Sequence, residues 1–212
     1  MVALTQPRAD RVVLYDISWQ QFENLLANLG ESRGTRVAYD SGTLEIMTPL
    51  PEHEYYKETL GDTIKDIAEV LAQEYESLGS TTWKRKLKQA GVEADNCFYF
   101  QNEPKIRGKL DIDLERDPPP DLALEIDVTS KSLARFPIYA PLGVPEIWCY
   151  DSGKLKIYQL NGQEYIEVET SSIFPTLPVG ELPQLIEQHR CSGRLSLRRA
   201  VRKWARENVG NV

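Results

Sequence analysis

Three carboxylates recur on one apolar segment, residues 121–128. Asp121, Glu125 and Asp127 are separated by even intervals, so on an extended strand their side chains project from the same face. The alternate positions are apolar, which predicts a strand covered on both faces. Neighbouring buried carboxylates are costly unless a cation or hydrogen bonds compensate them, and a hard divalent ion would do so. The other interpretation is a strand end whose acids face water or pair with basic neighbours.

A further acid, Asp95, lies in segment 91–100, where a second strand is expected. If the two strands are neighbours in a sheet, Asp95 can meet Glu125 and share a metal ion with it. Asp95 is followed by Asn96, and this pair of residues is common in turns. Taken alone, Asp95 is best explained as a turn residue.

Two basic clusters are candidates for contact with an anionic partner. The segment Lys84–Lys86 follows Trp83, which is typical either of a phosphate-binding stripe with an aromatic ring for base stacking or of a solvated strand. The tail, residues 194–206, carries six cationic side chains. Three interpretations are open for this segment: contact with DNA, contact with an acidic surface of a partner, or a solvated helix that docks by its apolar side. The third is favoured, because a run of charged residues is usually a solvated face. The apolar side consists of Leu197, Val201 and Trp204.

Several classes of protein are disfavoured. The sequence has no Gly-x-Ser-x-Gly, Walker or Gly-x-Gly-x-x-Gly motif, which argues against triad hydrolases, NTPases and dinucleotide-binding enzymes. With two histidines and three scattered cysteines, a structural zinc site is not expected. His53, at the start of a predicted helix, is interpreted as a surface residue rather than a base or ligand. An odd number of widely spaced cysteines is typical of reduced thiols rather than disulfides. The sequence shows neither a secretion signal nor an apolar segment long enough to span a membrane. We therefore expect a cytoplasmic protein without membrane contact.

The chain is acidic. Its 212 residues have a formal net charge of -7. Dedicated nucleic-acid binders are usually basic, because phosphate neutralisation supplies much of their affinity. The overall charge therefore argues against tight DNA binding, but metal-binding carboxylates would themselves contribute negative charge.

The elements that must position these residues alternate between helix and strand. A capping box at Ser18 and Gln21 predicts a helix that ends near Gly30. A long helix is expected from Glu52 to Gly79, and another in the tail, 195–208. A short helix is expected at 133–142. Strands are expected at 36–39, 43–47, 81–87, 92–100, 122–128, 147–150, 155–158 and 165–168. This order predicts one α/β (α+β) domain whose sheet is flanked by helices.

Four motifs in one order resemble the Uma-type restriction endonuclease family of the PD-(D/E)XK superfamily. They are residues 47–54, residues 91–95, residues 120–130, and residues 137–148 apart from position 141. The resemblance covers roughly residues 15 to 190. It implies a restriction-endonuclease-like mixed sheet, a nuclease domain at residues 1–190 and a basic helical tail at 191–212.

The resemblance also implies a metal site. Asp95 and Glu125 match the family's metal-binding acids, and the carbonyl of Ile126 would complete their set. Glu52 resembles the helical glutamate that often joins such sites, with Glu54 as a competitor. The implied activity is Mg²⁺- or Mn²⁺-dependent hydrolysis of phosphodiester bonds in DNA. Cutting two strands needs two active sites, so a homodimer is expected.

The chain departs from the family pattern at three places. Ala94 replaces the proline before Asp95, and Asp127 stands where the superfamily signature has lysine. The family often recovers that charge four residues before its tyrosine, which here is Arg135, before Tyr139. Lys131, Lys84 or Lys86 could also supply the charge and contact nucleic acid. The rival interpretation is a catalytically impaired nuclease fold that serves as a nucleic-acid or protein interaction module.

Overall fold

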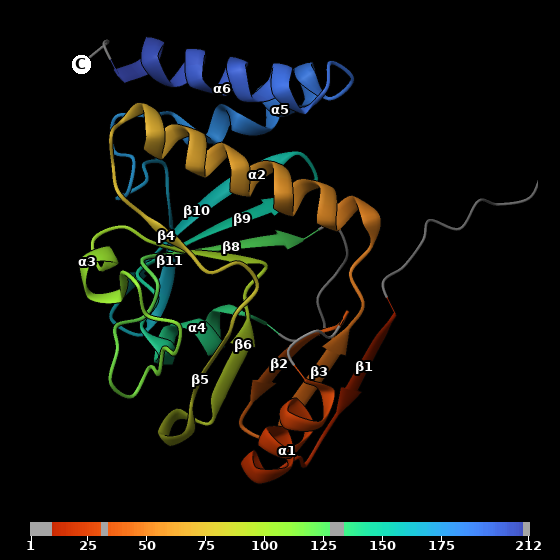
Figure 1. The fold of residues 1–212 in the computed structure, drawn as a ribbon. Coiled ribbons are helices and arrows are strands. Elements are labelled where there is room, and N and C mark those ends of the chain that lie inside the picture. The colour runs from red at the N-terminus through yellow and green to blue at the C-terminus, as the bar shows by residue number, and fades with distance from the viewer. Residues whose placement is uncertain (1–9, 31–33, 128–133, 210–212) are drawn as a thin grey trace, which may run out of the picture.

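The computed structural model describes residues 10–30, 34–127 and 134–209. These residues include eleven strands, six α-helices and two short 3₁₀ turns. Figure 1 shows how the helices and strands are arranged. The helices are α1 (Trp19–Leu29), α2 (Pro51–Val70), α3 (Glu103–Ile106), α4 (Phe136–Leu142), α5 (Leu182–His189) and α6 (Arg194–Val209). The strands are β1 (Arg11–Leu14), β2 (Arg36–Asp40), β3 (Thr43–Met47), β4 (Glu76–Ser77), β5 (Thr82–Arg85), β6 (Ala90–Glu93), β7 (Asn96–Tyr99), β8 (Leu122–Asp127), β9 (Glu146–Asp151), β10 (Lys154–Asn161) and β11 (Glu164–Val168).

The strands form two sheets. The five-stranded sheet has the order β1-β3-β2-β6-β5 and is antiparallel throughout. The six-stranded sheet has the order β11-β10-β9-β8-β7-β4, and in the described part of the chain β8 and β9 are its only parallel pair. The chain passes from one sheet to the other between β6 and β7, at Ala94 and Asp95. The α+β class and the mixed sheet flanked by helices are confirmed, whereas the division into two sheets was not foreseen.

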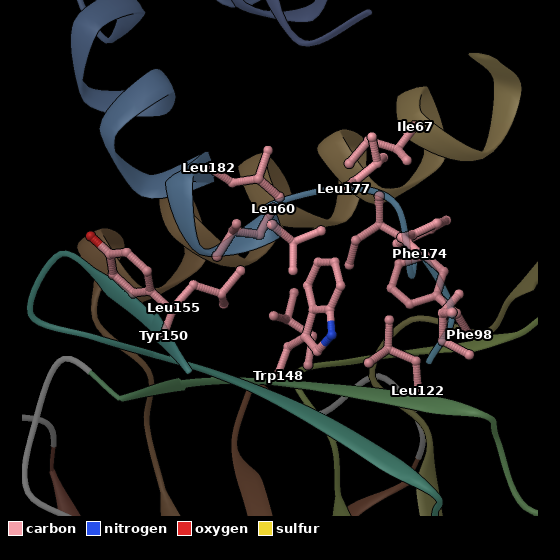
Figure 2. Close-up of a cluster of buried hydrophobic side chains, with 14 of the residues drawn as sticks. Leu60, Ile67, Phe98, Leu122, Trp148, Tyr150, Leu155, Phe174, Leu177 and Leu182 are labelled. Carbon is pink, nitrogen blue, oxygen red and sulfur yellow. The ribbon is translucent and has the colours of Figure 1, made fainter. Parts of the chain in front are cut away.

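The main core lies between the six-stranded sheet and the layer formed by α2, α5 and α6 (Figure 1). One face of β8 supplies the apolar residues Leu122, Leu124 and Ile126, as the alternation along this strand predicts. Figure 2 shows Trp148 of β9 beneath Leu60 of α2, with further core side chains on both sides. The carboxylates of β8 therefore belong to the opposite face.

That opposite face packs on α4 and the five-stranded sheet. Ala123 of β8, Tyr139 of α4 and Val92 of β6 are all fully buried in this second cluster. A third cluster joins α1 to the outer face of the five-stranded sheet. The two sheets and α4 thus enclose the end of β8 where Glu125 lies.

The tail helix α6 packs directly on α2. Leu197 and Val201 are buried in the main core, as expected, together with Ala205, while Trp204 packs at its border. The carboxylate of Asp66 on α2 accepts hydrogen bonds from two arginines of the tail. Their shortest distances to Asp66 Oδ1 are 2.9 Å for Arg198 and 2.8 Å for Arg202. Two of the six cationic side chains of the tail therefore neutralise acids of α2 in this same chain.

Two expected boundaries are wrong. The long helix α2 ends at Val70 rather than Gly79, because Ala72 takes a left-handed conformation with φ 51° and Gln73 N donates to the Ala68 carbonyl at 2.9 Å. The strand expected at 92–100 is interrupted at Ala94 and Asp95, where the chain changes sheets. Helix α5 was not predicted. None of the described helices is long and apolar enough to cross a bilayer.

Candidate functional site

Asp95 and Glu125 meet because β7 and β8 are antiparallel neighbours. The register pairs Asn96, the first residue of β7, with Leu124. Asp95, which precedes Asn96, therefore lies opposite Glu125. The main-chain N–H of Ile126 donates to Asp95 Oδ2 at 2.7 Å. Asp95 and Glu125 are both only 4% exposed. The sheet therefore brings two buried carboxylates into one corner, as the sequence predicted for neighbouring strands.

Helix α2 brings His53 to the same corner. His53 Nε2 lies 3.1 Å from Asp95 Oδ2, and His53 Nδ1 lies 3.4 Å from Glu54 Oε1. Burial alone lowers the pKa of His53, but the contact with Asp95 and the charges of Glu54 and Glu125 outweigh burial and raise it. His53 is 3% exposed, so its interpretation as a surface residue is wrong.

The approach of α2 to the sheet depends on a small residue. A Cβ atom at Gly61 would lie 2.6 Å from Asn96 Nδ2, next to Asp95 in the chain. The Asn96 side chain is buried, and its Oδ1 accepts a hydrogen bond from the Cys97 N–H at 2.9 Å. Gly61 thus lets the helix lie close enough to the strand for its first turn to reach Asp95.

Helix α4 contributes Tyr139. Its hydroxyl donates a hydrogen bond to Glu125 Oε1. Burial first, and then the charge of Glu125, raise the pKa of Tyr139 well above its ordinary value, so the hydroxyl keeps its proton. Tyr139 is fully buried.

The five-stranded sheet supplies a charged layer beneath these residues. Arg36 of β2 contacts three acids: Glu93 at 3.1 Å, Glu54 at 3.3 Å and Asp95 at 3.8 Å. Glu45 of β3 is completely buried. Arg36 and Glu93 are also buried, so the contact between them is largely shielded from water.

Arg135 lies over this layer, just before α4. Its Nη2 donates to Glu45 Oε1 at 2.8 Å, and Arg11 Nε lies 3.5 Å from Glu45 Oε2. Arg135 is buried, yet its Nε and Nη1 have no hydrogen-bond partner among the described residues. Buried donors of this kind call for a ligand, ion or water.

The other expected site residues lie apart from this corner or at its edge. Glu52 is exposed and lines a hollow of about 230 Å³ with Tyr56, Tyr150 and Glu187 among its neighbours, so α2 turns His53 and Glu54, not Glu52, toward the carboxylates. Asp127, at the end of β8, is partly buried. Lys131 lies outside the described residues.

The basic segment after Trp83 is also separate. Lys84 and Lys86 line a hollow of about 350 Å³ beside α1 and the loop 111–116, and Lys84 Nζ lies 3.2 Å from Glu23 Oε1. Trp83 is 1% exposed, so its ring is not available to stack on a base. Asp121 serves structure, because its carboxylate accepts hydrogen bonds from the N–H groups of Phe100 and Asn102.

Sequence reasoning missed Arg36, Glu45 and Glu93 as members of the site. Glu45 looked like the solvent-facing position of an alternating hairpin strand. One signal was available, since its strand neighbours two residues away, Thr43 and Met47, include an apolar side chain on the same face. That signal is too weak to identify a buried acid.

The donor set is compatible with a hard divalent ion. No group of three or more His, Cys, Asp or Glu side chains among the described residues is arranged to hold a metal. The expected set needs only the carboxylates of Asp95 and Glu125 and the carbonyl of Ile126. Magnesium commonly takes one or two carboxylates and keeps several waters, so this oxygen-rich corner fits it.

Comparisons with known proteins place the chain in a family. A solved structure titled "Crystal structure of a putative nuclease belonging to DUF820 from Anabaena variabilis ATCC 29413" resembles it at 12% identity and a TM-score of 0.46, over 80% of this chain and 90% of that one. No curated protein matches the chain. The family model Uma2, described as "Putative restriction endonuclease", matches residues 19–190. The chain belongs to this Uma2 family.

Proposed function

We propose that this chain is a Mg²⁺- or Mn²⁺-dependent endonuclease that hydrolyses phosphodiester bonds in DNA. The observation that carries the proposal is the hydrogen bond from the Ile126 N–H to Asp95, which puts that acid against the peptide following Glu125. Two buried carboxylates are thus held side by side at the end of a central strand. Membership of a restriction endonuclease family supports the same reading.

The residues have different roles in this proposal. Asp95, Glu125 and the Ile126 carbonyl would hold the ion. Bound there, a divalent ion supplies an activated water and neutralises charge on the phosphate. His53 lies against Asp95, where it limits the movement of that carboxylate.

Arg135 is assigned to the phosphate. A guanidinium is a hydrogen-bond donor and does not serve as a general base, but its N–H groups bind phosphate oxygens well. The Glu45 carboxylate holds Nη2, while Nε and Nη1 have no hydrogen-bond partner among the described residues. These two N–H donors therefore suit phosphate oxygens. Arg135 would thus replace the lysine of the superfamily signature, whose position Asp127 occupies.

The remaining assignments concern the surface. Lys84 and Lys86 are assigned to the DNA backbone outside the catalytic corner, together with Lys131. A homodimer is part of the proposal because two-strand cleavage requires two such sites. Sedimentation velocity of the full chain with a duplex oligonucleotide tests it, and one monomer bound per duplex would contradict it.

Calorimetric titration with Mg²⁺ and Mn²⁺ is the primary test. The wild type is expected to bind, and Glu125→Ala to lose binding, because the substitution removes one of two carboxylate ligands. Glu167→Ala is the matched control, since Glu167 lies on the exposed edge strand β11. A wild type that binds neither ion, or a Glu125→Ala chain that binds as well as the wild type, would overturn the metal site.

A plasmid-nicking assay then tests the chemistry. The wild type should nick DNA in Mg²⁺ or Mn²⁺, and Asp95→Ala should not. The second candidate is an interaction module that retains the fold without catalysis, which Asp127 at the lysine position favours. An inert wild type that still binds duplex DNA, by fluorescence anisotropy, would support this module over the nuclease.

A further inference from the structure

The hydroxyl of Tyr139, a tyrosine of the core, bonds a carboxylate of the proposed metal site. Tyr139 is fully buried on α4, between the two sheets, and its hydroxyl donates to Glu125. Tyr39 and Tyr99 are equally buried, and their hydroxyls donate to main-chain carbonyl oxygens. A buried tyrosine hydroxyl needs a hydrogen-bond partner, and a main-chain carbonyl is sufficient for that purpose. The choice of a carboxylate partner therefore matters for Glu125 rather than for Tyr139.

That consequence is orientation. A glutamate side chain has three rotatable bonds, and its carboxylate rotates about the last of them with little preference. The rigid ring of Tyr139, packed in the core, fixes the position of Glu125 Oε1 relative to β8. Just before the neighbouring strand, Asp95 accepts a hydrogen bond from the N–H of Ile126 and contacts His53 Nε2. Each carboxylate of the corner is thus tied to a donor on an element of the scaffold.

We propose that Tyr139 is a positioning residue that holds the Glu125 carboxylate in the orientation a divalent cation requires. The inference rests on the proposed function, because it concerns the same cation site. Hydrogen-bond partners of metal ligands typically change metal affinity by about 10- to 100-fold when they are removed. Tyr139 does not touch the ion or the substrate; it acts through Glu125.

Tyr139→Phe tests this role, because it removes the hydroxyl and keeps the ring. Titration calorimetry of the full chain with Mn²⁺ is expected to show binding weakened by about 10- to 100-fold. Tyr99→Phe is the matched control: it removes the hydroxyl of another fully buried tyrosine side chain, on β7, one that bonds the Pro118 carbonyl at 3.1 Å. This control should bind Mn²⁺ as the wild type does. Thermal unfolding without metal should show similar losses for both variants.

Three outcomes would overturn the inference. Unchanged Mn²⁺ affinity in Tyr139→Phe means that the hydroxyl does not position the ligand, although the metal site itself stands. An equal loss of affinity in Tyr99→Phe means that the effect is a general loss of stability. No binding by the wild type removes the proposed function, and the inference with it.

A second measurement covers the case in which Tyr139→Phe does not fold. The natural sequence is labelled with 3-fluorotyrosine and titrated with Mg²⁺, while the fluorine resonances are followed by NMR. One tyrosine signal is expected to shift along the Mg²⁺ binding curve and to become insensitive to Mg²⁺ in Glu125→Ala. If no tyrosine signal responds while Mg²⁺ binds, Tyr139 does not communicate with the cation and the inference falls.

Discussion

The buried carboxylate of Asp66 is expected to hold the tail helix on the rest of the molecule. Its side chain has no exposed surface, and it accepts three hydrogen bonds from Arg198 and Arg202 at 2.8 to 2.9 Å. Asp66→Ala removes the acceptor of both arginines at once. The residues of α6 would then keep their apolar contacts with α2 and the more exposed contact of Arg202 with Glu69.

The expected loss of stability follows from burial on the two sides. A hydrogen bond to a charged group contributes about 1.5 to 3 kcal/mol when buried. The arginine side chains are 38% and 33% exposed and recover water when the carboxylate is lost, which reduces their share. Counting one interaction for each arginine at the lower end gives a loss of about 3 kcal/mol. For a domain of this size, that corresponds to a fall in Tm of about 6 to 12 °C.

Urea unfolding followed by tryptophan fluorescence measures this loss. Glu69→Ala is a demanding control, because Glu69 also contacts Arg202, at 2.8 Å, but its side chain is 62% exposed. An exposed pair of this kind contributes at most about 1 kcal/mol. If Asp66→Ala costs no more than Glu69→Ala, the ion pairs do not hold α6, and the basic face of the tail must have another purpose.

Two further predictions concern the corner around Asp95. Because the pKa of His53 is raised, protonation of this residue stabilises the fold fully below its ordinary pKa of 6.5, and the contribution is lost as pH rises through the higher folded-state pKa. In metal-free buffer the unfolding free energy of the wild type should fall across that window relative to His53→Asn; parallel profiles would contradict this. Gly61→Ala should cost about 1 to 3 kcal/mol by overpacking against Asn96, whereas Gly180→Ala, with open space around its Cβ, should be nearly neutral by the same urea assay.

Local sequence patterns predicted the presence of helices and strands better than the residues at which they begin and end. The capping box is present as predicted, with Ser18 and Gln21 exchanging hydrogen bonds, and the strands expected at 155–158 and 165–168 pair as β10 and β11. These features depend on residues close in sequence, so the sequence alone specifies them. The end of α2 depends on a left-handed conformation that alanine rarely adopts, and the break before β7 depends on the change of sheet, and both predictions were wrong. The roles of Asp95, Glu125 and their partners in metal binding stay predictions.

The sequence by itself determined the α+β class, the apolar and acidic faces of β8, and the motifs by which the family is recognised. Each follows from spacing within a short segment or from residues read one at a time. Only the tertiary structure decided which charged groups share the corner. Arg36 meets Glu93 across 57 residues and Arg135 meets Glu45 across 90, and His53 turns inward where Glu52 does not. Such contacts depend on how two sheets and two helices pack, and the free energy that selects this packing is spread over the whole core rather than any local pattern.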